Sequence, residues 1–466
     1  IEKYLKNPKH IEVQVISDMY GNHLHLFERD CSIQRRYQKI IEEAPSNYLD
    51  EKKRNIIGEM AVSIARSVKY EGVGTVEFIF DEEGKHYFLE MNTRLQVEHP
   101  VTEMIANIDL VEWQLKIAYG EKLSLDQKKI KFNGHSIEAR LYAENPNIDF
   151  LPSSGKIYYL QFPKSIEFSR NEKVRIDSGI RKNDEITDLY DPMLAKLIVH
   201  GANRSEAITI MSRALSNFEI VGPHTNIEFL KNIIDSKEFS SGKIDTNFID
   251  KNKKTLLENI KIIYPEVLAL VVSKIFLNES SLSSDPWKSS FGWRLNSTLI
   301  RKLIFFTNTS EIEIKIKYQK QGLDFSFDEK DYFLSNFKSH GNNICLKFND
   351  LLLNANVIFV NNYFYVFYNE KKWELKWEDI HSFQEKNEYE KANFTSPMPG
   401  KIISLLVNKN DFVEKGLPLL TIEAMKMEHT IVAPSKGIIK DIMFKVGQHV
   451  KEGDQLILFS SGEESD

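Results

Sequence analysis

The sequence predicts an α+β fold divided into several domains, on three observations. Over residues 1–250, short segments that alternate apolar and polar side chains lie between segments with apolar residues at helical spacing. Residues 311–379 carry short β-rich runs behind a helical segment, which predicts a small antiparallel sheet or barrel with a helical lead-in. Residues 394–462 contain an internal repeat, which predicts an all-β domain.

The domain organisation follows from length and from changes of pattern. A chain of 466 residues is long enough for about three domains. The pattern changes divide it into segments 1–120, 121–250, 251–393 and 394–462.

The composition is that of an ordinary globular protein. Hydrophobic residues make up 42% and charged residues 27%, and the net charge of −6 is spread along the chain, so we expect no nucleic-acid partner. The most apolar stretch, Val267–Val272, is too short to cross a bilayer and predicts a buried helix, so we expect no membrane span. Two cysteines, Cys31 and Cys345, make no disulfide framework and favour a reducing compartment. Cys31 is interpreted as a small buried residue.

Three elements are expected over residues 1–250 besides one hairpin. His10–Ile16 alternates apolar with polar residues and predicts a half-buried strand. Glu51–Tyr70 has its apolar residues at helical spacing and predicts an amphipathic helix, and Arg204–Phe218 predicts a second helix.

The hairpin brings carboxylates together. Thr75–Phe80 and Tyr87–Asn92 flank an Asp-Glu-Glu-Gly turn signal, and the strands are related about this turn. Glu77 and Glu90 are therefore expected directly opposite each other, which is destabilising unless the charges are compensated. Asn92 lies two residues beyond Glu90 and on the same face. Two carboxylates and an amide oxygen on one face suit a hard cation such as Mg²⁺ with phosphate co-ligands.

The middle of the chain shows no catalytic constellation. Asn252–Leu277 predicts a helix that begins a new unit. The β-rich runs that follow are Ile312–Ile316, Tyr363–Tyr368 and Trp373–Trp377, and the polar, acidic segment His381–Asn393 is expected to be a linker.

The internal repeat singles out one lysine. Gly400-Lys-Ile-Ile and Gly437-Ile-Ile-Lys lie 37 residues apart, and further matches follow at the same offset. Two β-units of this size cannot each bury a core alone, so they should pack face to face as a flattened barrel. Lys426 falls between the two copies, flanked by strands, and is expected on an exposed turn.

The residues around this lysine carry a specific resemblance. Ala424-Met425-Lys426-Met427, with Glu423 before it and Glu428-His429 after it, closely resembles the biotinyl domain of biotin-dependent carboxylases, as does Ser396-Pro397-Met398-Pro399-Gly400. Related lipoyl domains share the repeat but typically carry Asp-Lys-Ala at the turn. The resemblance implies that Lys426 is the site at which a biotin protein ligase attaches biotin.

A second resemblance covers residues 1–250. The segment Asn92–Glu103, Asn-Thr-Arg-Leu-Gln-Val-Glu-His-Pro-Val-Thr-Glu, is similar to the signature of biotin carboxylase, an ATP-grasp enzyme. Further matches are Cys31–Arg36 with Gln38 and Lys39, Gly134–Arg140, and Tyr190–Met193. The resemblance implies that residues 1–120 are the C-terminal part of an ATP-grasp fold and 121–250 the C-terminal domain of the carboxylase.

This resemblance implies a role for each matching residue. The ligands of Mg²⁺ (or Mn²⁺) on ATP would be Glu77, Glu90 and Asn92. The nucleotide would contact Glu2, Lys3, Leu5 and His10, together with Glu77 and Glu90. Bicarbonate would be bound by Lys39, Arg94, Gln96, Val97 and Arg140. Catalysis would rest on Arg94, on Glu98 as the base that deprotonates bicarbonate, and on Arg140 as the cation that stabilises the ureido oxyanion of biotin.

Two departures from the family pattern affect these expectations. Tyr37 stands where many members carry His or Asn, which leaves open the family's nucleotide contact at this position. The chain begins at Ile1, and the family's N-terminal lobe, with its glycine-rich loop and ATP-binding lysines, has no counterpart in it. We therefore expect a fragment of a longer protein, with negligible bicarbonate-dependent ATPase activity of its own.

The acyl-CoA acceptor is expected to lie on another subunit. Residues 251–393 resemble the domain that docks the α subunit of an acyl-CoA carboxylase onto its carboxyltransferase β subunit. The resemblance implies an α/β hetero-oligomer, a dodecamer. Ser284–Asn296 resembles the α subunits of 3-methylcrotonyl-CoA carboxylase, an enzyme of leucine catabolism. The expected location is the cytoplasm of a bacterium or the mitochondrial matrix of a eukaryote.

Several alternatives remain open. The α subunit of a propionyl-CoA, acetyl-CoA or geranyl-CoA carboxylase would fit the same motifs. A biotin carrier or scaffold without ligase activity would not require the charged set at residues 77–140. An ATP-grasp ligase for another substrate would leave Lys426 unexplained.

Overall fold

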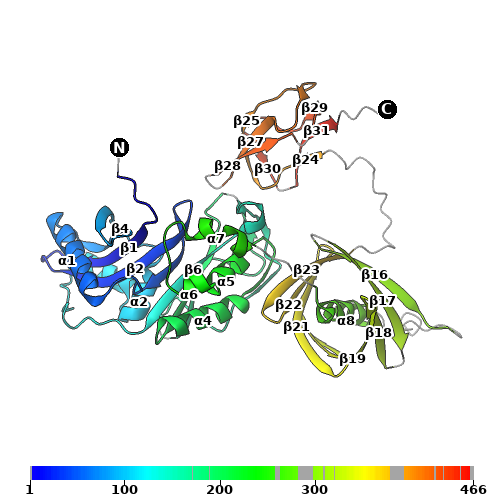
Figure 1. Ribbon diagram of the computed structural model, residues 1–466, viewed down its shortest axis with the longest axis horizontal. Coiled ribbons are helices and arrows are strands. Elements are labelled where there is room, and N and C mark those ends of the chain that lie inside the picture. The colour runs from blue at the N-terminus through cyan, green and yellow to red at the C-terminus, as the bar shows by residue number, and fades with distance from the viewer. Residues whose placement is uncertain are drawn as a thin grey trace.

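The computed structural model describes most of the chain as three units, built from residues within 3–257, 263–377 and 393–461 (Figure 1). Within these ranges, residues 170–171, 188, 282–296, 308–309, 320, 425–426, 434 and 452 are not described. Glu2, Lys426, the segment Ser284–Asn296 and residues 381–392 of the expected linker therefore lie outside the described residues.

A nine-stranded sheet organises the first unit. In spatial order its strands are β11 (Ile166–Glu167), β12 (Val174–Ser178), β14 (Met193–Gly201), β6 (His135–Tyr142), β3 (Gln38–Ala44), β2 (His23–Arg35), β1 (Lys9–Ser17), β4 (Gly72–Phe80) and β5 (His86–Asn92). Only the β11–β12 pair of this sheet is parallel. The expected strands at 75–80 and 87–92 are confirmed as β4 and β5.

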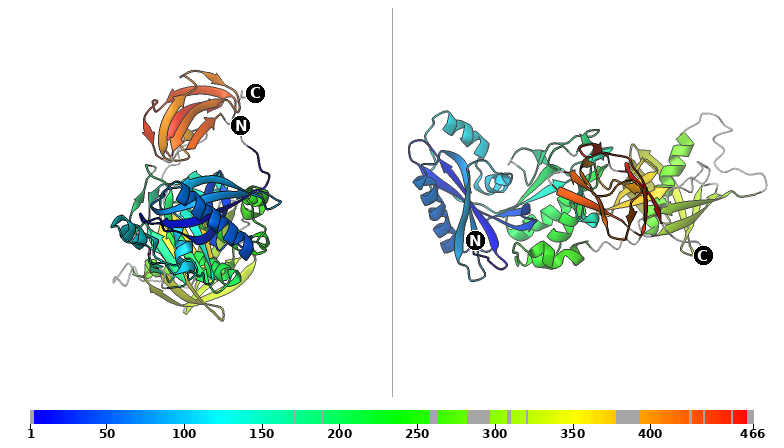
Figure 2. Two further views of the ribbon diagram at one scale, coloured as in Figure 1. Left: turned by 90° about the vertical axis from the view of Figure 1, so that its left-hand side faces the viewer. Right: turned by 90° about the horizontal axis from the view of Figure 1, so that it is seen from above.

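Seven helices in the described part of this unit pack against the sheet and against one another (Figure 2). They are α1 (Glu51–Ser67), α2 (His99–Ala106), α3 (Leu110–Ala118), α4 (Arg204–Ser216), α5 (Ile227–Ile234), α6 (Lys237–Ser240) and α7 (Phe248–Leu257). The predicted helices at 51–70 and 204–218 are confirmed as α1 and α4. Asp50 caps α1 by accepting a hydrogen bond from the backbone N–H of Lys53 at 2.7 Å, which fixes where the helix begins.

The predicted strand at residues 10–16 is confirmed as β1, but its expected half-exposure is wrong. Glu12 and Gln14 are as fully buried as Ile11 and Val13 on the opposite face. The strand lies in the interior of the sheet, α1 covers the apolar face, and α2 and α3 lie against neighbouring strands. The polar positions of β1 therefore line a buried polar layer instead of a solvated face.

Short elements complete the first unit. They are β7 (Glu144–Asn145), the 3₁₀ turn η1 (Pro146–Ile148), β8 (Leu151–Pro152), β9 (Gly155–Lys156), β10 (Tyr159–Gln161), β13 (Glu185–Ile186) and β15 (Glu219–Val221). They form three two-stranded sheets, β7–β8, β9–β13 and β10–β15. The last pair carries contacts to the second unit: Asn356 Nδ2 donates to Glu219 Oε2 at 2.8 Å and Lys372 Nζ to the carbonyl of Ile220 at 3.2 Å.

The second unit is a closed antiparallel barrel around a helix, α8 (Pro265–Ser281) (Figure 1). Its strands are β16 (Ile300–Phe306), β17 (Glu311–Gln319), β18 (Gly322–Phe327), β19 (Lys330–His340), β20 (Asn343–Phe348), β21 (Leu351–Val360), β22 (Tyr363–Tyr368) and β23 (Lys371–Trp377). Val267–Val272 is at most 1% exposed and packs into the barrel core, which confirms the predicted buried helix. The single helix expected over 252–277 is instead two, because α7 ends at Leu257 with the first unit and α8 begins at Pro265.

The third unit is a pair of four-stranded sheets. Its strands are β24 (Asn393–Thr395), β25 (Gly400–Leu405), β26 (Phe412–Val413), β27 (Pro418–Ala424), β28 (Met427–Val432), β29 (Gly437–Ile442), β30 (His449–Val450) and β31 (Gln455–Ser461). The sheet orders are β24-β31-β29-β26 and β28-β27-β25-β30, so each copy of the repeat supplies strands to both sheets. One shared apolar core lies between them, which confirms the face-to-face packing predicted from the repeat.

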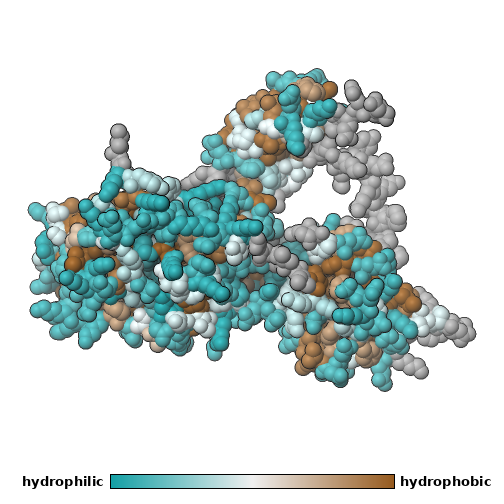
Figure 3. Space-filling model, in the orientation of Figure 1, coloured by the Kyte–Doolittle hydropathy of each residue, from teal (hydrophilic) through white to brown (hydrophobic). Residues whose placement is uncertain are grey.

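The surfaces of the units differ in character. The face shown in Figure 3 is largely hydrophilic over the first unit and carries more apolar residues over the barrel and the third unit. Exposed apolar side chains of the third unit include Leu406, Phe412 and Val446. None of the helices in the described part of the chain combines the length and the apolarity that a bilayer span needs.

Candidate active site

A row of charged residues crosses four neighbouring strands of the large sheet. Arg29 of β2 pairs with Glu12 of β1, Glu12 pairs with Glu77 of β4, and Glu77 pairs with Glu90 of β5. Residues paired in this way lie on the same face of a sheet. Three carboxylates therefore lie side by side, and their repulsion requires cations nearby.

The predicted pairing of Glu77 with Glu90 is confirmed, although the hairpin reaches it by a different route. The turn spans Asp81–Lys85, and beyond it Phe80 pairs with His86 and Phe78 with Phe88. That register alone would place Leu89 opposite Glu77. A β-bulge between the Phe78 and Glu77 pairs inserts one residue into β5 and returns Glu90 to that position.

Lys39 of β3 provides the central compensating charge. Its Nζ lies 2.5 Å from Glu12 Oε2, 2.7 Å from Glu98 Oε1 and 2.9 Å from Glu77 Oε1. The side chain is only 13% exposed, so the three contacts are shielded from water. Burial lowers the pKa of Lys39, but the surrounding carboxylates outweigh this and raise it well above the ordinary value.

Arg29 compensates the other end of the row. It is completely buried, and its Nε pairs with Glu12 Oε1. Its two NH groups donate to oxygens of Gln14, Thr75, Gln96 and Thr102 at 2.6–3.0 Å. Burial raises the pKa of Glu12, but the charges of Arg29 and Lys39 outweigh it and lower that pKa to about 2.

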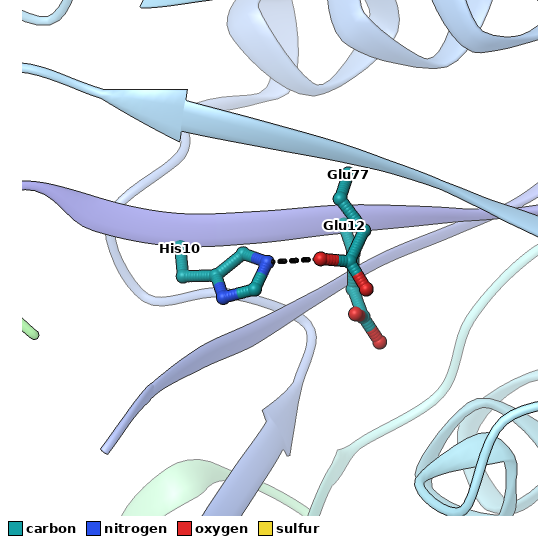
Figure 4. A group of neighbouring side chains, drawn as sticks. All are labelled: His10, Glu12 and Glu77. Carbon is teal, nitrogen blue, oxygen red and sulfur yellow. Dashed lines mark hydrogen bonds and ion pairs between the residues drawn. The ribbon is translucent and has the colours of Figure 1, made fainter. Parts of the chain in front are cut away.

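His10 closes the row on the β1 side. Figure 4 shows its ring directed at a carboxylate of the Glu12–Glu77 pair, and the interaction is between His10 Nε2 and Glu77 Oε2 at 2.6 Å. Glu77 Oε1 also accepts from Asn92 Nδ2 at 2.9 Å and from Gln96 Nε2 at 2.7 Å. Burial raises the pKa of Glu77, but the hydrogen bond from His10 and the charge of Lys39 outweigh it and hold that pKa well below the usual range.

Glu98 lies between two cations. It ends the segment that joins β5 to α2, and α2 begins at His99. Glu98 Oε1 contacts Lys39 Nζ at 2.7 Å, and Glu98 Oε2 contacts an NH2 nitrogen of Arg140 of β6 at 3.0 Å. Arg140 Nε in turn pairs with Glu42 Oε1 of β3 at 2.6 Å. Lys196 of β14 holds the segment between β5 and α2 in place, because its Nζ donates to the Val97 carbonyl at 2.8 Å.

Most of the sequence-predicted site residues thus converge on one face of the sheet. They are His10, Lys39, Glu77, Glu90, Asn92, Gln96, Val97, Glu98 and Arg140. Arg94 is exposed and donates only to the neighbouring Leu95 carbonyl, at 3.3 Å, among the bonds that the structure records for it. Lys3 is exposed and donates to the Tyr87 hydroxyl at 2.7 Å, and Leu5 is half-buried. Tyr37 is 95% exposed at the β2–β3 turn.

The carboxylates and Asn92 fit a hard divalent cation such as Mg²⁺. Glu77 and Glu90 offer oxygen donors side by side, Asn92 lies within 3.3 Å of both, and Glu90 is exposed. As assigned, Asn92 directs its Nδ2 toward the carboxylates, and a bound cation would require the opposite amide orientation. The donor chemistry therefore matches, with Glu90 as the accessible ligand.

Four residues of the charge network were not singled out by sequence reasoning: Glu12, Arg29, Glu42 and Lys196. The alternation of Glu12 with apolar positions in β1 predicts a solvent-facing side chain. Arg29 carries no signal of its burial, because in β2 it lies within the charged run Glu28-Arg29-Asp30, which by pattern resembles a solvated segment. Its burial beside Glu12 depends on the strands β1 and β3 that flank β2.

Comparisons with known proteins assign the first and the third unit of this architecture to families. Residues 1–126 match the family "Carbamoyl-phosphate synthase L chain, ATP binding domain", residues 138–251 match "Biotin carboxylase C-terminal domain", and residues 392–459 match "Biotin-requiring enzyme". The methylcrotonoyl-CoA carboxylase subunit alpha of Arabidopsis thaliana is 37% identical, over 98% of this chain and 67% of that protein. The chain belongs to the α subunits of the biotin-dependent acyl-CoA carboxylases.

Other relatives and solved structures agree with this family. The Dictyostelium discoideum methylcrotonoyl-CoA carboxylase subunit alpha is 38% identical over 97% of this chain, which spans 66% of that relative's length, slightly less than two thirds. The human propionyl-CoA carboxylase alpha chain is 35% identical over 98% of this chain and 64% of its own. The biotin carboxylase domain of Hydrogenobacter thermophilus 2-oxoglutarate carboxylase, solved with MgADP and bicarbonate, superposes with a TM-score of 0.53 at 46% identity, covering 55% of this chain and 56% of its own. The family membership and the ATP-grasp carboxylase fold predicted from the motifs are confirmed.

We predict that Lys39→Met destabilises the first unit of this carboxylase subunit by about 3–5 kcal/mol at pH 7, because Glu12, Glu77 and Glu98 lose their shared cation. The depressed pKa values of Glu12 and Glu77 contribute stability that is present above their ordinary pKa of 4.5 and is lost as the pH falls through the lower folded-state values. The difference between wild type and variant should therefore shrink between pH 7 and pH 4, where the unpaired carboxylates of the variant take up protons.

Urea unfolding at both pH values, followed by tryptophan fluorescence and circular dichroism, measures this difference. Lys128→Met, at an exposed position, serves as the matched control. A loss of stability that is the same at pH 7 and pH 4 would contradict the charge-compensation account.

Proposed function

We propose that the protein is the α subunit of a methylcrotonoyl-CoA carboxylase, in which ATP and bicarbonate are used to carboxylate biotin attached at Lys426. The observation that carries the proposal is the position of Glu98 between Lys39 Nζ at 2.7 Å and an Arg140 nitrogen at 3.0 Å. A carboxylate held between two cations can accept a proton from an anion that the same cations attract.

In this proposal, Lys39 and Arg140 attract bicarbonate, assisted by Gln96, by the backbone at Val97 and by the exposed guanidinium of Arg94. Glu98 takes the bicarbonate proton, and a bicarbonate oxygen attacks the γ-phosphorus of ATP. ADP leaves, and the product is carboxyphosphate. The negative charge that builds up is stabilised by cations that the fold has already placed, which avoids reorganisation during the reaction.

The nucleotide is proposed to lie along the β1, β4 and β5 strands. Glu77, Glu90 and Asn92 would hold Mg²⁺ (or Mn²⁺), which supplies charge neutralisation on the ATP phosphates. His10 orients Glu77 through the 2.6 Å contact between its Nε2 and Glu77 Oε2. Glu2, Lys3 and Leu5, at the start of the chain, are assigned to the adenine side.

Lys426 is proposed as the attachment site of biotin, which would supply a ureido nitrogen to take up the carboxyl group of carboxyphosphate, with inorganic phosphate released and the ureido proton transferred to it. Strand β27 ends at Ala424, strand β28 begins at Met427, and these two residues pair with each other. In the sequence, Lys426 lies between these two residues and within the biotinyl motif. Arg140 is proposed to stabilise the oxyanion that develops on the ureido group.

The acceptor and the partners are proposed from the family. Methylcrotonoyl-CoA is favoured because the relatives with that name are 35–39% identical, against 35% for the propionyl-CoA carboxylase alpha chains. The propionyl-CoA enzyme is the alternative. The barrel around α8 is assigned to docking a carboxyltransferase β subunit, in an α/β dodecamer. A biotin protein ligase would modify Lys426, in the mitochondrial matrix of a eukaryote or the cytoplasm of a bacterium.

Biotinylation of Lys426 is directly testable. Co-expression of this chain with a biotin protein ligase should add one biotin, located by peptide mass spectrometry on the peptide that contains Lys426. Lys426→Arg should abolish the addition because an arginine side chain cannot form the amide. Lys440→Arg, at an exposed position of β29 in the same unit, should leave it unchanged. Biotin on any other lysine, or none at all, would refute the carrier assignment.

The base assignment predicts a kinetic effect in the full-length protein. Glu98→Gln should lower kcat for bicarbonate-dependent ATP cleavage by about 10²–10⁴-fold, the range expected when a general base is lost. Glu112→Gln, at an exposed position of α3, is the matched control and should retain the wild-type rate. A Glu98→Gln enzyme within a few-fold of wild type would exclude Glu98 as the base, whereas a wild-type enzyme inactive in the presence of its β subunit would exclude the proposed function.

A further inference from the structure

One buried acid next to the proposed site has no role in the reaction described above. Glu138 lies on β6, two residues before Arg140, and is 0% exposed. Neither of its carboxyl oxygens has a hydrogen-bond partner among the residues that the structure describes. It pairs directly with Glu42 of β3, whose Oε2 likewise has no partner there.

The cations near Glu138 bind other acceptors. Arg140 is bound to Glu42 Oε1 at 2.6 Å and to Glu98 Oε2 at 3.0 Å. Lys196 donates to the Val97 carbonyl at 2.8 Å and lies 3.4 Å from Asp177. On the side of β6 that carries Glu138, the neighbouring titratable groups are Glu42 on β3, Lys196 on β14, and Glu98, His99 and Glu103 at α2, with Arg175 and Asp177 of β12 beyond β14. Helix α4 packs on the opposite side, with Ile137 and Ala139.

An ionised Glu138 would be unfavourable in these surroundings. A buried carboxylate without a donor carries a large desolvation cost, and a second carboxylate directly opposite adds repulsion. The carboxylic acid form avoids both. Burial raises the pKa of Glu138 well above its usual range, and the charge of Glu42 raises it further, although Lys196 acts in the opposite direction.

Glu138 and Glu42 differ in how well their surroundings stabilise the ionised carboxylate. Burial also raises the pKa of Glu42, but Glu42 already accepts the hydrogen bond from Arg140 Nε, and that bond favours the ionised form. Glu138 accepts nothing from the described residues. Of the two carboxyl groups, Glu138 is therefore the one on which the protonated form is favoured.

We propose that Glu138 is a protonated carboxylic acid that acts as a positioning residue for Arg140. While Glu138 is neutral, Glu42 is the one anion that the described residues place behind the guanidinium, and Arg140 directs an NH2 group forward to Glu98. When Glu138 ionises at high pH, a second anion two residues away on the same strand face draws Arg140 back from Glu98. The role of Arg140 in this inference rests on the proposed function, but the protonation state of Glu138 does not.

Infrared difference spectroscopy tests the protonation state without any turnover. At pH 7, the spectrum of the wild type minus that of Glu138→Gln should show the carbonyl band of a protonated carboxylic acid. Neither Glu138→Gln nor Glu138→Leu should show this band. Glu42→Gln should keep this band, and Glu112→Gln, at an exposed position, should lose only carboxylate bands. Circular dichroism confirms that the variants are folded. A band that survives in Glu138→Gln and Glu138→Leu, or that disappears in Glu42→Gln, would overturn the assignment.

The positioning role is tested by the pH dependence of kcat/KM for bicarbonate in the full-length enzyme. Wild type should lose activity on the alkaline side, and Glu138→Gln, which cannot ionise, should move that decline to higher pH while the acidic limb stays in place. A purely structural role would lower the whole profile without moving its alkaline limb, and that result would overturn the inference. If no variant and no wild-type enzyme turns over bicarbonate, the proposed function fails, and the infrared result still decides the state of Glu138.

Discussion

The constraint on which the site depends is the repulsion among carboxylates that the sheet forces side by side. The registers of β1, β4 and β5 place Glu12, Glu77 and Glu90 in one row, and neither backbone pairing nor the apolar core can relieve that repulsion. Lys39 and Arg29 relieve it from β3 and β2. These three strands can therefore pair in this register only with the two cations in place. The interactions that allow the fold thus also form the site at which we propose that bicarbonate and the metal ion of ATP bind.

The cations serve a second purpose because they are shared. Lys39 is bound by three carboxylates, and one of them, Glu98, comes from the segment that joins β5 to α2. Arg140 likewise connects Glu98 to Glu42. A substrate anion that contacts either cation must compete with a carboxylate already present, and the carboxylate it meets at both is Glu98. This sharing links substrate binding to the release of the group that we assign as the base. A neutral Glu138 adds no further anion behind Arg140, so Arg140 remains in contact with Glu98.

The sequence predicted those parts of the structure that depend on local pattern. The hairpin follows from strand patterns around a turn signal, the repeat from matches 37 residues apart, and the buried helix Val267–Val272 from a short apolar run. The pairing of Glu77 with Glu90 was predicted correctly even though the bulge at β5 was not, because the five-residue turn and the bulge shift the register in opposite directions. The burial of Glu12 could not be predicted, since it depends on which strands flank β1 and on a cation from β2. Helix α1 shows the same limit: it buries Ile57 and Ala61 and leaves Ile56 44% exposed, because the neighbouring strands decide which side faces the core.

The measurement that tests this account most directly is a crystal structure of the full-length protein with bicarbonate and MgADP. The account predicts bicarbonate in contact with Lys39 and Arg140 beside Glu98, with the cation on Glu77, Glu90 and Asn92, and with Lys39 still paired with Glu12. Bicarbonate bound away from Glu98, with the contacts of Lys39 and Arg140 to Glu98 unchanged, would contradict the claim that these shared cations form the substrate site.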